Sequence, residues 1–528
     1  MDRSNKLHLA LWAALLVALA GCSTLRKDFA KPHSTALPPA TETPTAKYVD
    51  AEQDQHRQGQ SGFRLLTLSS NALMSRLTLA DHAEQSLDLQ YYIFRGDATG
   101  KLVAQHLVKA ADRGVRVRVL LDDITQDEEA PMFDALDAHQ NIQVRIFNPF
   151  KTRSPGILSK AAQMLLEFRR LNRRMHNKNF IVDNKIAIVG GRNIADDYFD
   201  ADEKDNFRDL DLLAIGPVVQ QASHTFDTYW NDDAAIPVSA YKSRRDKVVD
   251  LARLRVELNE HVRAFAASDY AQAVIEELPD GATADRRGQW FWGPAVLVAD
   301  QPEKIEADDD KPGLRIGPAL QTLLDGAKSE ALLMSPYFVP GERDEQQLVA
   351  MAKRGVVTRI LTNSLASSDE PAVHTGYSAH RRALLAGGVQ LYELKPVAGV
   401  KQTSAQWSRS SSVSLHAKSF VVDRRYVFVG SMNMDHRSKL LNTEMGLIVD
   451  SPPLAKAVAD FFTTVTLPAN AYRLSLENPD GTASGSGQIL WHTSEAGKPV
   501  TLSREPDVGV AKRAELLLLK LLPIDGLL

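Results

Sequence analysis

Two short stretches decide the fold of this chain: His176-Asn-Lys178-Asn-Phe-Ile-Val-Asp183 and His416-Ala-Lys418-Ser-Phe-Val-Val-Asp423. Each opens an extended segment rich in Phe, Ile and Val, in which residues two positions apart point to the same face. The His and the Lys of each stretch are therefore expected to project together from one side of a strand. Each pair can then reach one ligand.

The paired residue types suit chemistry at phosphorus. A histidine can attack phosphorus or carry a proton near neutral pH, and a lysine two positions away offers a positive charge to a phosphoryl oxygen. One copy alone could equally be an ordinary strand end with satisfied polar residues. Two copies, each followed by Gly-x-x-Asn at 190–193 or 430–433, make that alternative much weaker. The pattern predicts one phosphodiester-cleaving site built from both copies.

These motifs are the last of four landmarks that recur in the same order in both halves of the chain. The matching segments are 86–92 with 331–337, 102–122 with 347–362, 141–149 with 388–396, and 176–193 with 416–433. Internal similarity at a large, nearly fixed offset indicates a duplicated unit. Apolar strand patterns alternate with helical patterns that end at Gly, so the sequence predicts two α/β units with mostly parallel sheets.

Length and composition agree with two folded units. The chain has 528 residues, of which 44% are hydrophobic and 24% charged, enough to bury a substantial core. Lys and Arg total 62 against 66 Asp and Glu, a net charge of −4, so the chain lacks the basic excess that nucleic-acid binding needs and no nucleic acid is expected as a partner. The single cysteine excludes a disulfide framework and a Cys-rich zinc site.

Residues 1–21 are predicted to be a lipoprotein signal peptide. Arg3 and Lys6 precede a run of Leu, Ala and Val that is too short to remain as a membrane-spanning helix. The run ends in Leu19-Ala-Gly-Cys22, which resembles the bacterial lipobox and marks Cys22 as the lipidation site. The alternative is plain cleavage beside a free cysteine. Acyl chains on both the thiol and the new amine give stable anchoring.

Residues 22–50 are rich in Pro, Thr and Ala, a composition that predicts a semi-extended tether holding the body off the lipid surface. Ser23 follows the cysteine where the sorting rules of Gram-negative lipoproteins place Asp for retention in the inner membrane. The expected location is therefore the bacterial cell envelope, lipid-anchored and facing the periplasm, with the outer membrane favoured over the inner.

With both motifs in view, the sequence resembles the phospholipase D superfamily, whose members carry a twinned H-x-K-x4-D motif. The resemblance runs from about residue 60 to 465, and its segments 190–199, 207–211 and 430–444 look like the bacterial cardiolipin synthases, most closely the C type. It implies two pseudo-symmetric α/β/α units, with mostly parallel or mixed sheets and the active site at their interface. The expected boundaries are 51–290 for the first unit, 291–470 for the second, and 471–528 for a C-terminal hairpin and apolar tail.

The resemblance also implies an activity. It predicts a phosphatidyltransferase that makes cardiolipin from phosphatidylglycerol and another glycerophospholipid, through a phosphohistidine and without metal or cofactor. By resemblance His176 is the nucleophile and His416 the acid/base, although the near-symmetry of the halves leaves the reverse assignment open. The groups expected to hold the non-bridging oxygens and offset the charge of the pentavalent state are Lys178, Lys418, Asn193 and Asn433.

A histidine nucleophile needs an acceptor on its far ring nitrogen, so that the reactive nitrogen stays unprotonated and aimed. Asp209 follows His176, and Glu444 follows His416, at similar distances and just before an apolar strand. Each acid is the candidate partner of the histidine in its own half. Asp211, on the same strand face as Asp209, is an equally good candidate for His176.

The two aspartates that close the motifs, Asp183 and Asp423, belong to the catalytic set of the family pattern. Their place at the far end of a short strand suits fixing the local turn better than touching phosphate. Both roles are kept as expectations.

Residues 151–175 carry seven Lys and Arg against one acid, Glu167, mixed with apolar residues. Such a segment suits a surface helix that lies on anionic lipid, and the alternative is a solvated helix packed across the sheet edge. Its place just before His176 favours the lipid contact. The arginines expected to face lipid are Arg169, Arg170, Arg173 and Arg174.

Three other functions remain as alternatives. A phospholipase D that hydrolyses phospholipids to phosphatidic acid uses the same residues, with water in place of the acceptor. A nuclease fits the superfamily but not the anchor or the net charge, and a non-catalytic envelope scaffold does not require two intact motifs. The donor lipid and the oligomeric state are left open by the sequence.

Overall fold

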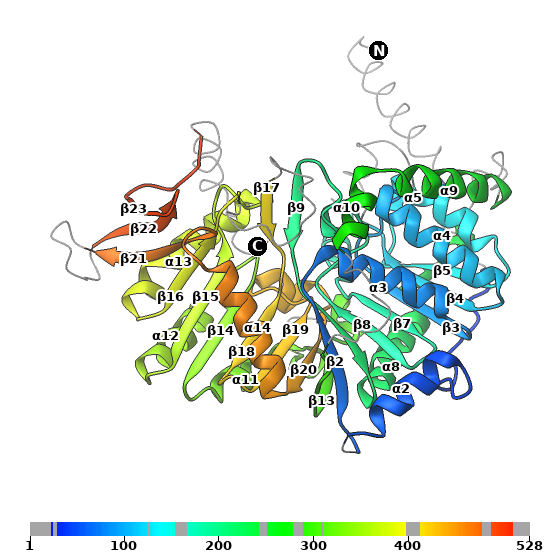
Figure 1. The fold of residues 1–528 in the computed structure, drawn as a ribbon, viewed down its shortest axis with the longest axis horizontal. Helices are drawn as coiled ribbons and strands as arrows, with labels where there is room; N and C mark the ends of the chain where they lie inside the picture. The colour runs from blue at the N-terminus through cyan, green and yellow to red at the C-terminus, as the bar shows by residue number, and fades with distance from the viewer. Residues whose placement is uncertain are drawn as a thin grey trace, which may run out of the picture.

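The computed structural model describes residues 23–24, 29–56, 58–124, 126–150, 152–153, 166–241, 251–277, 289–307, 311–397, 412–477 and 487–509. Two large sheets lie beside each other, the first built from the N-terminal half and the second from the C-terminal half (Figure 1). The chain changes from the first sheet to the second between Gly293 and Ala295. The expected α/β class with two repeated units is confirmed.

The first sheet has nine strands in the order β11-β5-β4-β3-β7-β8-β10-β2-β12. β3, β4 and β5 are parallel, and the other pairings in this sheet are antiparallel. The sheet is thus mixed around a parallel centre, which agrees with the expectation of mostly parallel or mixed sheets. Antiparallel pairs enter because the motif strand β7 turns straight back into β8. The strands are β2 Ser61–Leu66, β3 Ser86–Tyr91, β4 Arg116–Asp122, β5 Ile142–Phe147, β7 Asn179–Val182, β8 Ile186–Gly190, β10 Asp211–Ile215, β11 Ala235–Pro237 and β12 Phe291–Gly293.

The second sheet repeats this plan in the order β13-β20-β19-β18-β14-β15-β16-β21-β22-β23. Its parallel centre is β14, β15 and β16, and its motif strand β18 forms a hairpin with β19. The expected C-terminal hairpin is β21 with β22, and it extends this sheet beyond β16. The strands are β13 Ala295–Ala299, β14 Glu330–Met334, β15 Val357–Asn363, β16 Gln390–Leu394, β18 Ser419–Val422, β19 Tyr426–Gly430, β20 Met445–Asp450, β21 Ala471–Glu477, β22 Gln488–Glu495 and β23 Lys498–Leu502.

Helices cover the outer faces of the sheets and also fill the space between them. α3, α4 and α5 pack on the first sheet with α9 and α10 outside them, and α12 and α13 pack on the second (Figure 1). α8 contacts the first sheet and β13, whereas α14 contacts the second sheet and strands β2 and β12. The helices are α2 Pro44–Gln53, α3 Ser69–His82, α4 Ala98–Asp112, α5 Gln126–Asp137, α7 Phe168–Leu171, α8 Pro217–Asn231, α9 Leu251–Ala266, α10 Asp269–Glu277, α11 Gly317–Asp325, α12 Glu342–Lys353, α13 Pro371–Ala386 and α14 Pro452–Val465.

Several short elements complete the described chain. Two strand pairs stand outside the large sheets, β1 with β6 and β9 with β17. Their bounds are β1 Ser23–Thr24, β6 Thr152–Arg153, β9 Asp205–Arg208 and β17 Ser412–Leu415. The single helical turns are η1 Asp196–Tyr198, η2 Val238–Ala240, η3 Pro302–Ile305, η4 Pro312–Leu314 and η5 Arg437–Leu441.

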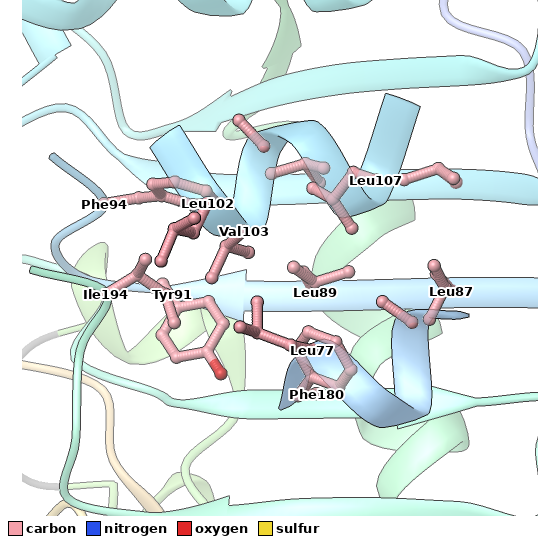
Figure 2. Packing of buried hydrophobic residues seen from close by; sticks show 14 of the residues in the cluster. Leu77, Leu87, Leu89, Tyr91, Phe94, Leu102, Val103, Leu107, Phe180 and Ile194 are labelled. Carbon is pink, nitrogen blue, oxygen red and sulfur yellow. The ribbon is translucent and has the colours of Figure 1, made fainter. Parts of the chain in front are cut away.

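Helix α4 illustrates how the sequence pattern builds each unit. The Asp97 side chain caps it by accepting a hydrogen bond from the Gly100 amide, and the chain leaves the helix at Gly114, whose φ of 94° suits glycine. Its apolar face covers the buried side of β3. Figure 2 shows this packing, in which the labelled side chains are Leu77, Leu87, Leu89, Tyr91, Phe94, Leu102, Val103, Leu107, Phe180 and Ile194.

The two halves share one hydrophobic core. They also have two backbone crossings, by which we mean places where backbone segments from different halves pair with each other. That core joins Phe226 and Trp230 of α8 to Phe462 of α14. β9 of the first half pairs in parallel with β17 of the second, and Met175 pairs with Thr443. Each crossing leads directly into a motif histidine, so the same contacts build the interface and the site.

A strap, defined as residues 29–53, lies on the first unit where a free tether was expected. The amide of Ser34 donates to Asn231 Oδ1 at 3.1 Å, and the amide of Ala36 donates to Asp227 Oδ2 at 2.7 Å. Farther along, the Ala40 amide donates to the Asp183 carbonyl at 3.1 Å. Helix α2 then closes the strap and buries its apolar side.

The prediction of a tether over 22–50 is therefore wrong from residue 29 onwards. The composition alone could not build a core, but the first unit supplies the missing partners. Arg118 donates to the Ser34 carbonyl at 3.0 Å, and the Trp230 indole donates to the Ser34 hydroxyl at 2.9 Å. The signal peptide, Cys22 and the apolar tail at 510–528 lie outside the described residues. No helix in the described ranges is long and apolar enough to cross a bilayer.

Removing the carboxylate of Asp227 is expected to loosen the strap. Asp227→Ala deletes the acceptor of the Ala36 amide, whereas Arg118 keeps Asp88 as its other partner, at 2.6 Å. Loss of the acceptor of a partly buried amide costs about 1 kcal/mol, so the amides of residues 33–37 and 40 should exchange with deuterium roughly five times faster. Hydrogen exchange read by mass spectrometry measures this change. Asp460→Ala, which removes an exposed carboxylate on α14, is the control, and equal exchange in both variants would contradict the prediction.

Candidate active site

Each motif histidine is held by a backbone carbonyl from the opposite half of the molecule. The His176 amide donates to the Thr443 carbonyl at 2.9 Å, and the His416 amide donates to the Arg208 carbonyl at 2.8 Å. Thr443 directly precedes Glu444, and Arg208 directly precedes Asp209. The two halves thus contact each other through two equivalent backbone hydrogen bonds, which are related by the internal repeat.

The side chains repeat this exchange between halves. Nδ1 of His176 lies 2.9 Å from one carboxylate oxygen of Glu444 and 3.1 Å from the other. Nδ1 of His416 lies 2.6 Å from Oδ2 of Asp209. Asp209 and Glu444 thus both contact a motif histidine, but the expectation that each contacts the histidine of its own half is wrong. The parallel pairing of β9 with β17 carries Asp209 across the interface to His416.

Asp211, the other acid considered for His176, has a different position. Its side chain is buried between two arginines, at 3.0 Å from Arg76 and 3.3 Å from Arg192. Arg192 also donates to the Asp209 carbonyl at 2.7 Å. Asp211 therefore supports the segment that carries Asp209 and does not contact His176, and its candidacy is wrong.

The two motif lysines lie on the same side of their strands as the histidines, as the period of two predicts. Nζ of Lys178 donates to the His176 carbonyl at 2.7 Å, and Nζ of Lys418 donates to the His416 carbonyl at 2.5 Å. Both lysines are almost fully buried. The charge of Lys418 acts on His176 and that of Lys178 acts on His416, so the two pairs share one electrostatic environment.

Aromatic rings form the walls beside the histidines. Tyr92 meets His176 edge-on with ring centroids 4.9 Å apart, and Tyr198 meets His416 edge-on at 5.0 Å. Phe207 is tilted against His416, also at 5.0 Å. Sequence reasoning missed all three as site residues. Their only sequence signal was their place next to the repeated landmarks, after β3, in η1 and in β9.

Burial keeps both histidine rings neutral. Removal from water, followed by the nearby charge of Lys178, lowers the His176 pKa well below its usual range. The same two causes, with Lys418 as the main charge, lower the His416 pKa to about 4 against the opposing effect of Asp209. With Nδ1 facing a carboxylate, each ring carries its proton there and presents an unprotonated Nε2.

The two orienting acids differ in charge environment. Burial raises the Glu444 pKa to about 7, although Lys178, Ser431 and other groups oppose it. Burial acts in the same direction on Asp209, but His416, Lys418 and Arg192 outweigh it and lower the Asp209 pKa to about 2. Burial also lowers the Lys418 pKa, to about 8. Asp209 is therefore ionised at neutral pH, whereas both the ionised and the protonated form of Glu444 are populated there.

Asp183 and Asp423 occupy turns away from the histidines. The Asp183 carboxylate accepts hydrogen bonds from the amides of residues 84–86, at 2.8 Å and 2.9 Å for the last two. The Asp423 carboxylate does the same for residues 328–330 at the start of β14. These contacts match the expected turn role, and membership of Asp183 and Asp423 in the catalytic set stays a prediction. Across the described ranges, no group of three or more His, Cys, Asp and Glu side chains is arranged to hold a metal ion.

The motif asparagines have unequal surroundings. Asn193 Oδ1 accepts from the Ile93 amide at 3.1 Å, and its Nδ2 donates to the Tyr198 hydroxyl at 2.8 Å. Asn433 is also buried, but its Oδ1 has no hydrogen-bond partner among the described residues. Contact of either side chain with a phosphoryl oxygen stays a prediction.

The arginines before His176 belong largely to the interior. Arg174 is buried and pairs with Asp122 at 2.7 Å, and Arg173 is buried with a bond to the Ala307 carbonyl at 2.6 Å. Arg170 pairs with Glu167 at 2.8 Å. The expectation that Arg173 and Arg174 face lipid is wrong, since both hold the approach to His176 in place. Residues 154–165 of this segment lie outside the described residues.

The relatives of this chain agree with the geometry. A family model described as "Cardiolipin synthase, PLD-like domain" matches residues 77–230 and 320–466, one match in each half. Cardiolipin synthase C of Escherichia coli (strain K12) is 38% identical over 491 residues, covering 89% of this chain and 97% of that protein. The chain belongs to the cardiolipin synthase family of phospholipase D-like proteins. The resemblance seen in the sequence is thereby confirmed, as is the enzyme class, a phosphatidyltransferase of this superfamily.

Two other comparisons are consistent with this family. An uncharacterized protein of Helicobacter pylori strain J99 is 35% identical over 399 residues, 75% of this chain and 77% of that one. The crystal structure of phosphatidylserine synthase from Haemophilus influenzae Rd KW20 superimposes with a TM-score of 0.52, over 91% of this chain and 99% of that chain, at 12% sequence identity. At that identity the likeness concerns the fold alone, and it spans both repeated halves.

The low histidine pKa values predict the pH behaviour of the substrate-free enzyme. His416 should stay neutral down to about pH 5, because its pKa of about 4 leaves less than a tenth of the ring protonated there. Because the unfolded chain takes up this proton near pH 6.5, stability should fall as the pH drops from 6.5 towards 4. NMR of 15N-histidine enzyme, assigned by comparison with His416→Asn, follows the ring directly. A ring that titrates near pH 6.5 at this position would contradict the burial argument.

Proposed function

We propose that this chain is a lipid-anchored phosphatidyltransferase that makes cardiolipin from phosphatidylglycerol and a second glycerophospholipid. The observation that carries the proposal is the exchange of carboxylates across the interface, which brings two His–Lys pairs into one buried site. Two imidazoles on one phosphorus are what a two-step transfer requires. The name of the Escherichia coli relative, cardiolipin synthase C, supports the choice of lipid.

The first step forms a bond between Nε2 of His176 and the phosphorus of the donor lipid. The bond from phosphorus to the headgroup oxygen breaks, and His416 donates a proton to that oxygen as it leaves. The acceptor hydroxyl then gives its proton to His416 and attacks the same phosphorus, which releases His176. Atoms and protons balance, because the headgroup alcohol leaves and the acceptor takes its place.

The different surroundings of the two acids support this order of roles. As the acid, His416 must be protonated before the first step, although its ring is neutral in the substrate-free enzyme, where its pKa is about 4. Its partner Asp209, whose pKa is about 2, is ionised near neutrality and stabilises the protonated ring once the anionic phosphate of the donor lipid is bound. His176 must attack as a neutral ring, and burial together with Lys178 holds its pKa well below the usual range. Lys178 and Lys418 supply the positive charge for the phosphoryl oxygens that gain charge in the transition state.

Anchoring at Cys22 would keep the enzyme at its substrate. The strap makes its first contact with the body at Lys31, which bonds the Asp232 carbonyl. Eight residues lie between this point and Cys22, a span of roughly 30 Å when fully extended. Strand β1, directly after Cys22, pairs with β6, which precedes the segment leading to His176. A bacterial envelope location facing the periplasm, with the outer membrane favoured by Ser23, remains part of this proposal.

Product analysis separates synthesis from hydrolysis. The acylated enzyme, incubated with vesicles of phosphatidylglycerol alone or with phosphatidylethanolamine, should form cardiolipin, detected by mass spectrometry. A rise in yield on adding phosphatidylethanolamine would identify it as a donor. Phosphatidic acid as the sole product would favour a hydrolase, and an unchanged lipid pool with a folded enzyme would reject both. His176→Asn with His416→Asn is the inactive control.

The roles of the histidines can be tested with a donor whose leaving group needs no proton. On a phosphatidyl ester of p-nitrophenol, His416→Asn should release about one equivalent of p-nitrophenol in a burst and then stall as the phosphohistidine enzyme. His176→Asn should give no burst. Intact-protein mass spectrometry detects the added phosphatidyl group. A burst in His176→Asn and none in His416→Asn would reverse the assignment.

A further inference from the structure

Two buried charges that the proposed reaction does not use lie directly behind Glu444. Asp300 and Lys304 come from the short segment that follows β13, and each side chain is about 2% exposed or less. Nζ of Lys304 lies 2.7 Å from Oδ2 of Asp300. Burying an ion pair is costly in free energy, and such a pair often adds little net stability. Its neighbours therefore suggest what else it does.

Asp300 fixes the backbone of Glu444 from both sides. The Asp300 amide donates to the Glu444 carbonyl at 2.9 Å, and the Glu444 amide donates to Asp300 Oδ2 at 2.7 Å. The first bond continues the β13–β20 ladder, in which Ala299 pairs with Met445. In the second bond, the Asp300 side chain accepts from the Glu444 amide, because the β13–β20 ladder has ended and offers no backbone acceptor there. The other oxygen of Asp300 accepts from the Ile316 amide at 2.7 Å.

Lys304 connects this segment to the rest of the site. Besides Asp300, its Nζ donates to the Ser438 carbonyl at 2.9 Å, and the Ser438 hydroxyl accepts the Asn433 amide at 3.2 Å. Its own carbonyl faces Arg173, three residues before His176. Lys304 thus touches both segments that lead into the His176 side of the site. Its charge acts on the Glu444 carboxylate.

We propose that the buried Asp300–Lys304 pair is a positioning pair for Glu444, in which Asp300 fixes the Glu444 backbone and Lys304 keeps the Glu444 carboxylate ionised against His176. This inference rests on the proposed function, because it assigns Glu444 to the nucleophilic histidine. An ionised Glu444 accepts the Nδ1 proton of His176 and leaves Nε2 free to attack. A protonated Glu444 can lose that acceptor role.

The first unit holds its orienting acid differently. There Arg192 takes the supporting position, and Gly191 stands where Ser431 stands in the second unit. A Cβ at residue 191 would lie 2.3 Å from Asp209 Oδ1, so only glycine fits beside that shorter acid. Ser431 instead donates its hydroxyl to Glu444. Among the described residues, the first unit shows no buried Asp–Lys pair bonded to the Asp209 backbone.

All charges that face Glu444 determine the direction of the expected effect. Burial raises the Glu444 pKa to about 7, and Lys178 and Lys304 lower it. Asp300 and Glu444 disfavour each other's charge. The other titratable groups that act on or respond to Glu444 are His176, Lys418, Asp435 and Tyr229. Removing the Lys304 charge must therefore raise the Glu444 pKa, and removing the Asp300 charge must lower it.

The test compares the pH profiles of kcat/KM for p-nitrophenol release from the phosphatidyl ester. In Lys304→Met the acidic limb of the profile should move to higher pH. Activity at pH 7 should fall about fivefold for a limb displaced by about one pH unit, and it should recover towards pH 9. In Asp300→Asn the limb should move to lower pH. Lys304→Arg, which keeps the charge, should restore the wild-type limb. Lys456→Met and Asp460→Asn, from an exposed pair with the same spacing, are the matched controls.

Two further measurements distinguish a failure of this inference from misfolding of a variant and from a failure of the proposed reaction. In a Glu444→Gln background, Lys304→Met should cause no additional displacement of the limb, because the titrating group is gone. NMR of His176 Nδ1 in the substrate-free enzyme should show the same opposite displacements without any turnover. Equal losses at all pH values, or limbs that move in the same direction in both variants, would overturn the inference. Absence of p-nitrophenol release from the wild type would instead count against the proposed function.

Discussion

The exchange of carboxylates between the two halves is the contact on which the rest of the site depends. His176 is held by Glu444 and His416 by Asp209, and each histidine amide is bonded to the residue just before the acid that it meets. The backbone crossings that place these acids also join the two sheets. A separation of the halves would therefore remove the orienting group from both rings at once, and with it the neutral, aimed Nε2 that chemistry at phosphorus requires.

The repeat explains why much of this could be read from the sequence. The strands β3, β4 and β5 and their counterparts are buried apolar runs, and the motifs fall on strands where a period of two fixes which residues share a face. Asp183 and Asp423 could be assigned to turns because each closes a short motif strand. The partners of the histidines could not be read correctly, because similarity within each half says nothing about which half supplies a neighbour. Only the parallel pairing of β9 with β17 reveals it.

Other errors share a physical cause. The Pro-, Thr- and Ala-rich segment looked like a tether, since its own side chains cannot form a core, yet Arg118, Asp227 and Trp230 offer it hydrogen bonds from the body. Arg173 and Arg174 looked like surface charges because charge is usually solvated. Here Asp122 and three backbone carbonyls satisfy them inside the protein. Composition reports what a segment can do alone, whereas these segments depend on partners far away in the chain.

The difference between Gly191 beside Asp209 and Ser431 beside Glu444 has an evolutionary consequence. In a symmetric dimer of identical subunits, every mutation changes both copies of a contact together. A single chain that carries both copies does not have that restriction, so the surroundings of one histidine can change while those of the other stay the same. A tandem protein of this kind is free to divide two tasks between inherited duplicates, which no homodimer encoded by a single reading frame can achieve.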